Sequence, residues 1–151
     1  MILLLQRVSR AAVRVGGETV GQIGRGLLVF GCVEPGDGPD AMDEAARKTV
    51  ELRVFEDGQG KMNLDVTQTG GAVLAVSQFT LGADLSRGRR PGFEGAARPE
   101  EARPLFGRYL AALRASGVPV APGSFGAGVG GELVNAGPAT FHWRTKRRPQ
   151  G

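Results

Sequence analysis

Two short runs of almost unbroken apolar residues, 26–33 and 72–79, place the strongest constraint on how this chain folds. Strands that read as continuous apolar runs are usually covered on both faces, so each run predicts a strand inside a layered core. Glycine supplies 25 of the 151 residues, against a typical share of about 7%. This excess favours turns, bulges and close backbone approaches over a helical bundle.

The rest of the chain supplies elements to surround these two strands. Apolar residues at helical spacing predict a helix over residues 40–52, and a second helix begins at Pro99 and ends near residue 116. A hairpin is expected at Gly16–Gly17, and a long loop at 82–98. Further strands are expected at 2–8, 12–15, 19–23, 53–55, 132–135 and 139–143. The predicted fold is a single α+β domain: a mainly antiparallel or mixed, barrel-like sheet with about two helices packed on it.

Composition excludes several kinds of site. Cys32 is the single cysteine and His142 the single histidine, which rules out an intramolecular disulfide, a cysteine zinc site and a histidine-rich metal cluster. Cys32 lies in an apolar run and is expected to be a buried, inert thiol, while His142 is expected at a surface or strand edge. A Ser-His-Asp triad is therefore poorly supported, and we expect neither a metal nor a cofactor.

The net charge of +4 comes from the C-terminal end. Without the four basic residues among the last eight, 15 basic residues balance 15 acidic ones. We therefore expect a neutral domain over 1–143 and a basic tail over 144–151. The N-terminal apolar run ends after five residues, too short for a signal peptide or a membrane span, so a soluble, cytoplasmic protein without a membrane partner is expected.

Two segments remain as candidates for a site. The second apolar run ends in Ser77, Gln78, Phe79 and Thr80, at a point where the backbone amides of a strand lose their hydrogen-bonding partners. Either polar groups nearby satisfy these amides, or the amides point at a ligand and stabilise an oxyanion. Gly137–Pro138 interrupts a strand-like stretch. It is either an ordinary tight turn or a cis step that directs two carbonyls to one side.

Several stretches together make the chain resemble the D-aminoacyl-tRNA deacylases, from Met1 to about Trp143. The most specific are residues 77–81 and the Asn-Ala-Gly-Pro sequence at 135–138, found in one chain. The others are residues 5–8, 11–13, 24–30, 53–55, 60–64, 87–88, 90–91, Phe93 and 123–127. The chain departs from the usual pattern at Val129, Gly131 and Ala139, which affects the expected packing around the Gly-Pro loop.

The resemblance implies a homodimer with shared active sites that hydrolyses the ester joining a D-amino acid, or glycine, to the terminal adenosine of tRNA. It implies that Gly137–Pro138 is cis and enters the partner's pocket to exclude L-amino acids, and that Arg7 orients the Gly-Pro carbonyls. It also implies that Ser77 to Thr80 line the pocket, with the Phe79 N–H beside the ester. The resulting hypothesis is chiral proofreading by substrate-assisted hydrolysis, in which the ribose 2′-OH positions or activates water.

Three alternatives stay open. The first is the trans-Pro branch of the same superfamily, which acts on L-alanyl-tRNA. The second is a non-catalytic RNA-binding domain that uses Arg87, Arg89, Arg90 and the tail, although a dedicated binder usually shows a basic face. The third is a small-molecule esterase, disfavoured because no triad is found.

Overall fold

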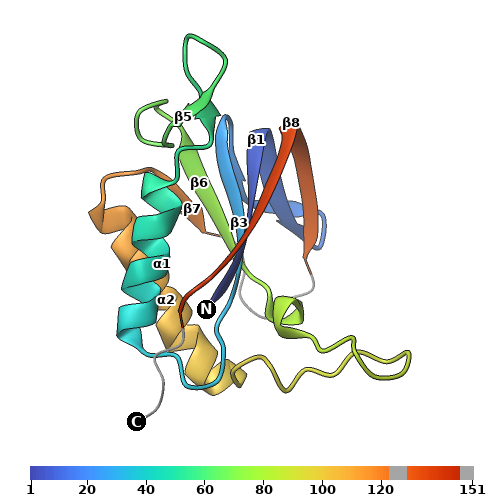
Figure 1. The fold of residues 1–151 in the computed structure, drawn as a ribbon. Coiled ribbons are helices and arrows are strands. Elements are labelled where there is room, and N and C mark those ends of the chain that lie inside the picture. Colours follow the sequence, from blue (N-terminus) through green and yellow to red (C-terminus); the bar gives the residue numbers. More distant parts are fainter. Residues whose placement is uncertain (123–128, 147–151) are drawn as a thin grey trace.

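The computed structural model describes residues 1–122 and 129–146, and the predicted tail beyond Lys146 and residues 123–127 of the resemblance lie outside that part. A mixed sheet and two helices make up the fold, with both helices against one face of the sheet (Figure 1). The elements are β1 (Ile2–Val15), β2 (Glu18–Ile23), β3 (Gly26–Cys32), α1 (Pro39–Glu51), β4 (Phe55–Glu56), β5 (Met62–Leu64), β6 (Ala72–Ser77), the 3₁₀ turn η1 (Phe79–Gly82), α2 (Pro99–Ala115), β7 (Val120–Pro122) and β8 (Gly130–Arg144).

The sheet is mixed and curls into a nearly closed barrel, which confirms the predicted fold class. Its strand order is β2-β1-β3-β6-β7, with β8 paired to β1. β1 pairs antiparallel with β2, β3 and β8, whereas β3–β6 and β6–β7 are parallel. Long strands paired at a bend let one sheet curve over its own core.

The strands that the two apolar runs form, β3 and β6, are buried on both faces, as predicted. In β3, Leu27 and Val29 belong to the core beneath the helices, while Leu28 belongs to a second cluster on the opposite face. In β6, Val73 and Leu74 divide between the same two clusters. The alternation of side chains along a strand accounts for this division, because neighbouring residues point to opposite faces.

Several predicted boundaries were wrong. Residues 2–8 and 12–15, expected as two strands, form the continuous β1, and residues 132–135 and 139–143 are parts of the continuous β8. The β1–β8 pairing shifts register twice between Gln6 and Arg10 and resumes on both sides, so each strand stays continuous across an irregularity instead of ending at it.

The second apolar run also ends earlier than predicted. The Gln78 N–H donates to the Gly31 carbonyl at 2.7 Å, and β3 itself ends one residue later, at Cys32. With no neighbouring strand to pair with, the chain turns into η1, and Phe79 is 57% exposed rather than buried. The run 72–79 is therefore a strand followed by an exposed turn.

At the C-terminal end, Thr145 is buried and donates its N–H to the Met1 carbonyl at 2.9 Å. The boundary between a 1–143 domain and a 144–151 tail stays a prediction. Within the described residues, neither α1 nor α2 has the length and apolar character needed to span a membrane.

Candidate active site

The segment Ser77 to Thr80 carries the polar end of a buried strand onto the surface. Ser77 and Gln78 are half-buried, and Phe79 and Thr80 are exposed. No turn or loop hydrogen bond within residues 1–122 and 129–146 is donated by the Phe79 or Thr80 amide, as expected for the first residues of a helical turn. The Gln78 side-chain amide donates to the Thr80 hydroxyl. The segment thus presents backbone N–H groups beside two linked polar side chains.

Cys32 supports this segment from below. Its thiol lies 3.6 Å from the carbonyl oxygens of Phe79 and Val33, and burial raises the pKa of the Cys32 thiol. A neutral, buried thiol is a weak donor rather than a nucleophile, which matches its predicted role.

Phe93 packs against the exposed ring of Phe79. The two ring centroids are 5.2 Å apart in an edge-on arrangement. Beside them lies a hollow of about 420 Å³ between η1 and the loop that follows it, lined by Pro35, Gly82, Asp84, Gly92, Glu94 and Gly95. An exposed apolar pair of side chains of this kind can mark a binding surface.

Gly137 and Pro138 lie on a bulge of β8. Gln6 of β1 is opposite Thr140, whereas Val8 is opposite Asn135, so four residues of β8 face the single residue between them. The Gly137–Pro138 bond is cis, as the resemblance implied, and both residues are exposed.

Asn135 closes the bulge from within β8. Its side-chain oxygen accepts the Ala139 N–H at 2.7 Å, and its amide donates to the Thr140 hydroxyl at 2.9 Å. The first residue of the Asn-Ala-Gly-Pro sequence thus holds the two ends of the bulge together. Sequence reasoning noticed Asn135 only as part of the motif and assigned it no role.

Arg7 holds the bulge from the side of β1. Its guanidinium Nε donates to the Ala136 carbonyl at 2.7 Å, and Nη1 donates to the Val54 carbonyl at 2.8 Å. Arg7 is 8% exposed, so these bonds lie largely out of water. It also forms one wall of a hollow of about 390 Å³ that reaches Gly137, Arg25 and Phe55.

The two halves of the candidate site do not meet within one chain. Ser77 pairs with Gly31, which pairs with Leu3, whereas Arg7 marks the level of the Gly-Pro bulge on the same β1 strand. Four residues of strand place the two levels about 13 Å apart along the sheet. In Figure 1, η1 lies at the lower end of the sheet, and β1 and β8 bend over at its upper end.

Two acidic side chains, Asp84 and Glu94, line the hollow beside Phe93. His142 is exposed on β8, as predicted, and no cluster of His, Cys, Asp or Glu suited to a metal occurs in the part of the chain that the structure describes. Within the described residues, the segment Ser77 to Thr80 itself offers backbone amides and neutral polar side chains, and the Gly-Pro bulge offers backbone carbonyls.

Comparison with known proteins gives the family. The family model described as "D-Tyr-tRNA(Tyr) deacylase" matches residues 4–144. A protein of Symbiobacterium thermophilum named "D-aminoacyl-tRNA deacylase" is 56% identical over 138 residues, 91% of either chain. A protein of Shewanella amazonensis with the same name is 52% identical over 142 residues, 94% of this chain and 98% of the relative.

Solved structures agree in fold. A structure described as "c-Myc DNA Unwinding Element Binding Protein" is 34% identical, with a TM-score of 0.91 over 97% of this chain and all of the other. A "probable eukaryotic D-amino acid tRNA deacylase" is 17% identical with a TM-score of 0.79, over 95% of this chain and 98% of the other, a likeness of fold alone. On the family match and the close relatives together, the chain belongs to the D-Tyr-tRNA(Tyr) deacylase family.

Proposed function

We propose that this protein hydrolyses the ester bond of D-aminoacyl-tRNA and releases the free D-amino acid and tRNA. Family membership supports the reaction class. The observation that carries the mechanism is the Phe79 amide: it belongs to an exposed residue at the end of a buried strand and donates no turn or loop hydrogen bond among the described residues. Such an amide is placed to stabilise the oxyanion that forms when water attacks an ester.

The substrate supplies what the protein surface lacks. An aminoacyl ester is already activated, and the ribose hydroxyl beside it can donate and accept a hydrogen bond. In the proposed mechanism the 2′-OH positions or activates water, the Phe79 N–H stabilises the oxyanion, and Thr80 orients neighbouring groups. The bond from Gln78 to the Thr80 hydroxyl favours this orienting role, because it fixes the hydroxyl. Ser77, at the start of the same segment, lines the substrate pocket in this proposal.

Selectivity is assigned to the Gly-Pro bulge. Gly137 and Pro138 are exposed while Arg7 and Asn135 hold the backbone on either side of them. A rigid edge of backbone carbonyls excludes an L side chain by collision, and it needs no pocket for any particular D side chain. Glycine attached to tRNA-Ala also passes such a filter, because glycine has no side chain that could collide with the carbonyls.

The bulge acts on a second copy of the chain. It lies about 13 Å along the sheet from the level of Ser77 in its own chain, which argues for a homodimer with shared sites. β8 has a strand on one side only within the described residues, and a long unpaired edge is suited to pairing with another chain. Dimerisation through the sheet is therefore part of the proposal.

Matched D- and L-aminoacyl-tRNA carrying the same amino acid test the function. We expect release from the D-ester only, measured as free amino acid in single-turnover reactions. Release of L-alanine supports the trans-Pro branch, binding without turnover supports an RNA-binding domain, and hydrolysis of simple esters supports a small-molecule esterase.

A Thr80→Ala variant tests the mechanism. Because Thr80 orients rather than attacks, we expect a modest loss on D-aminoacyl-tRNA. A folded variant that loses four or more orders of magnitude would show that the hydroxyl takes part in the chemistry, contrary to the mechanism.

A further inference from the structure

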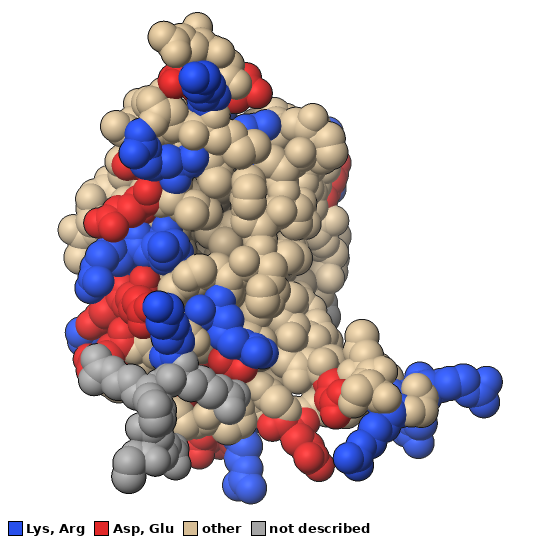
Figure 2. Space-filling view, viewed as in Figure 1, with Lys and Arg blue, Asp and Glu red and all other residues tan. Residues whose placement is uncertain are grey.

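A ribbon that carries three arginines leaves the body of the protein directly after η1. We call residues 83–95 the arginine arm. Its two sides are joined by a pair of backbone hydrogen bonds, from the Asp84 N–H to the Gly92 carbonyl at 2.7 Å and back from the Gly92 N–H at 2.9 Å. Arg87, Arg89 and Arg90 are all exposed near its tip. The segment extends away from the body at the lower right of Figure 1, and Figure 2 shows basic side chains projecting there.

The base of the arm is closely packed. Gly82 and Gly95 approach so closely that a Cβ on either would overlap the carbonyl of the other. Phe93 packs on Phe79, and the Ala97 N–H donates to the Val33 carbonyl at 2.8 Å. The direction of the arm is thereby fixed relative to the proposed catalytic segment.

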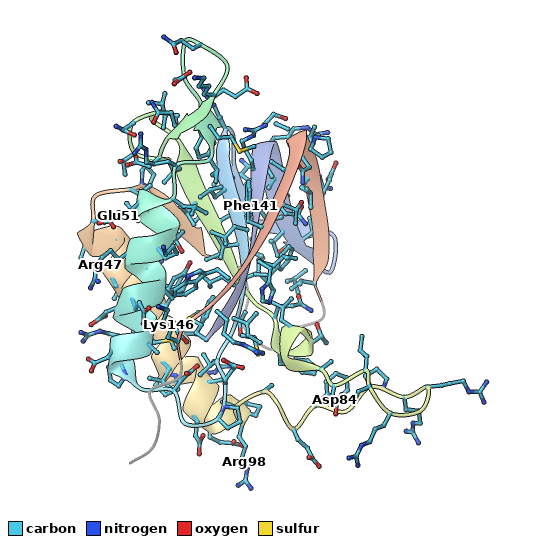
Figure 3. The ribbon with its side chains drawn as sticks, viewed as in Figure 1. Arg47, Glu51, Asp84, Arg98, Phe141 and Lys146 are labelled. Carbon is cyan, nitrogen blue, oxygen red and sulfur yellow. The ribbon has the colours of Figure 1, made fainter. Side chains whose placement is uncertain are left out.

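The first turn of the arm is also ordered from within. The Asp84 carboxylate, labelled in Figure 3, accepts the Ser86 N–H at 2.9 Å and its hydroxyl at 2.6 Å, and these bonds lower the pKa of Asp84. Asp84 is therefore engaged with its own turn. No ion pair to Arg87, Arg89 or Arg90 occurs among residues 1–122 and 129–146, so no described acidic group neutralises these three charges.

Unpaired guanidinium groups on a protruding, ordered arm fit a partner rich in phosphate. Guanidinium binds phosphate through two parallel N–H bonds and is more weakly hydrated than an ammonium group. The arm begins three residues after Thr80, and the eight peptide units between Thr80 and Gly88 span at most about 29 Å. The tip thus lies within reach of backbone phosphates that precede a nucleotide bound at Phe79.

We propose that the arginine arm binds the phosphates preceding the terminal adenosine at the acceptor end of tRNA, an inference that rests on the proposed function. Contacts to phosphate position a nucleic acid without reading its sequence. The arm therefore orients the acceptor end over the proposed catalytic segment in every tRNA, whichever amino acid is attached.

The test compares two triple variants with the same loss of charge. Arg87→Ala/Arg89→Ala/Arg90→Ala removes the arm's charges, and the control Arg47→Ala/Lys48→Ala/Arg114→Ala removes three exposed charges from the helices. Each is assayed on D-aminoacyl-tRNA and on the matching 3′-O-(D-aminoacyl)adenosine, which lacks the preceding phosphates. Binding of uncharged tRNA is measured alongside between 50 and 200 mM NaCl.

For the arm variant we expect KM for tRNA to rise at least tenfold, with the rate on aminoacyl-adenosine unchanged. The slope of log Kd for uncharged tRNA against log salt should decrease by about 2, because each of the three lost contacts to single-stranded phosphate contributes about 0.7 to the slope. The control variant should keep the wild-type KM and slope.

Three results overturn the proposal: unchanged tRNA affinity, an equal loss on both substrates, or a change of oligomeric state in light scattering, which would make the arm a subunit contact. If the wild-type protein cleaves neither ester, the proposed function fails. The Kd for uncharged tRNA then decides the arm separately, and an unchanged value in the arm variant rejects it.

Discussion

Replacing Arg7 with alanine removes the connection between β1 and the Gly-Pro bulge. Two hydrogen bonds from a charged, 8% exposed side chain are lost, to the carbonyls of Ala136 and Val54. Hydrogen bonds from charged groups contribute about 1.5–3 kcal/mol each. Ala136 is half-buried and regains water, so we expect the free energy of unfolding to fall by about 2–4 kcal/mol.

For a chain of this length, each kcal/mol lowers Tm by about 2–4 °C, so a decrease of about 5–15 °C is expected in calorimetry. The Ala136 carbonyl also loses its anchor. On the proposed function, Arg7→Ala therefore raises hydrolysis of the L-ester relative to the D-ester, measured on matched tRNA substrates.

Arg25→Ala is the matched control, because Arg25 lines the same hollow and carries the same charge. It is exposed and lies over the Phe55 ring at 5.7 Å, a contact of about 0.5–1 kcal/mol. An Arg7→Ala protein no less stable than the Arg25→Ala protein would refute the reasoning, as would unchanged selectivity between D- and L-esters.

Three further predictions concern single residues. Gly137→Ala should lose about 1–3 kcal/mol of stability in urea unfolding, because φ at Gly137 is 138° and a Cβ there would lie 2.5 Å from Arg7 Nη2. The control Gly131→Ala should be near neutral, because no atom lies within 4 Å of the added Cβ. Equal losses of stability in the two variants would contradict this prediction. Because burial raises the pKa of Cys32, iodoacetamide at pH 8 should label this thiol far more slowly in the native protein than in urea. For the same reason the free energy of unfolding should fall as pH rises through the thiol pKa of the unfolded chain. Fast labelling of the native protein would contradict the burial on which both expectations rest. Tyr109→Phe should lower the free energy of unfolding by about 1 kcal/mol, because the Tyr109 hydroxyl lies 2.8 Å from that of Thr49, between α1 and α2. If Tyr109→Phe costs as much in a Thr49→Val background, the hydrogen bond between the two hydroxyls does not contribute.

Sequence patterns predicted the layers of the fold because burial leaves a periodic signal. Leu27 and Leu28 both had to be buried, and the structure places them on opposite faces of one strand. The end of β6 left no such signal. Phe79 looks like a continuation of the run, yet it becomes exposed because the neighbouring β3 ends and hydrogen-bonding partners run out.

The support of the Gly-Pro bulge was less predictable. Arg7 bonds to backbone carbonyls 47 and 129 residues away, and a carbonyl leaves no mark in residue type. Arg7 was found by resemblance, whereas Val54 was not assigned a role. The separation of the two half-sites within one chain is likewise a matter of strand register, which short-range patterns do not encode.

In the proposed mechanism the substrate's own 2′-OH completes a site to which we assign no catalytic side chain among the described residues. This role of the 2′-OH is tested most directly with D-aminoacyl-tRNA whose terminal adenosine is 2′-deoxy, compared with the ordinary ester in single-turnover hydrolysis. The account predicts a rate lower by about two to four orders of magnitude, the usual contribution of a group that transfers or positions a proton, with the Kd for tRNA unchanged. Equal rates for the two esters would contradict it.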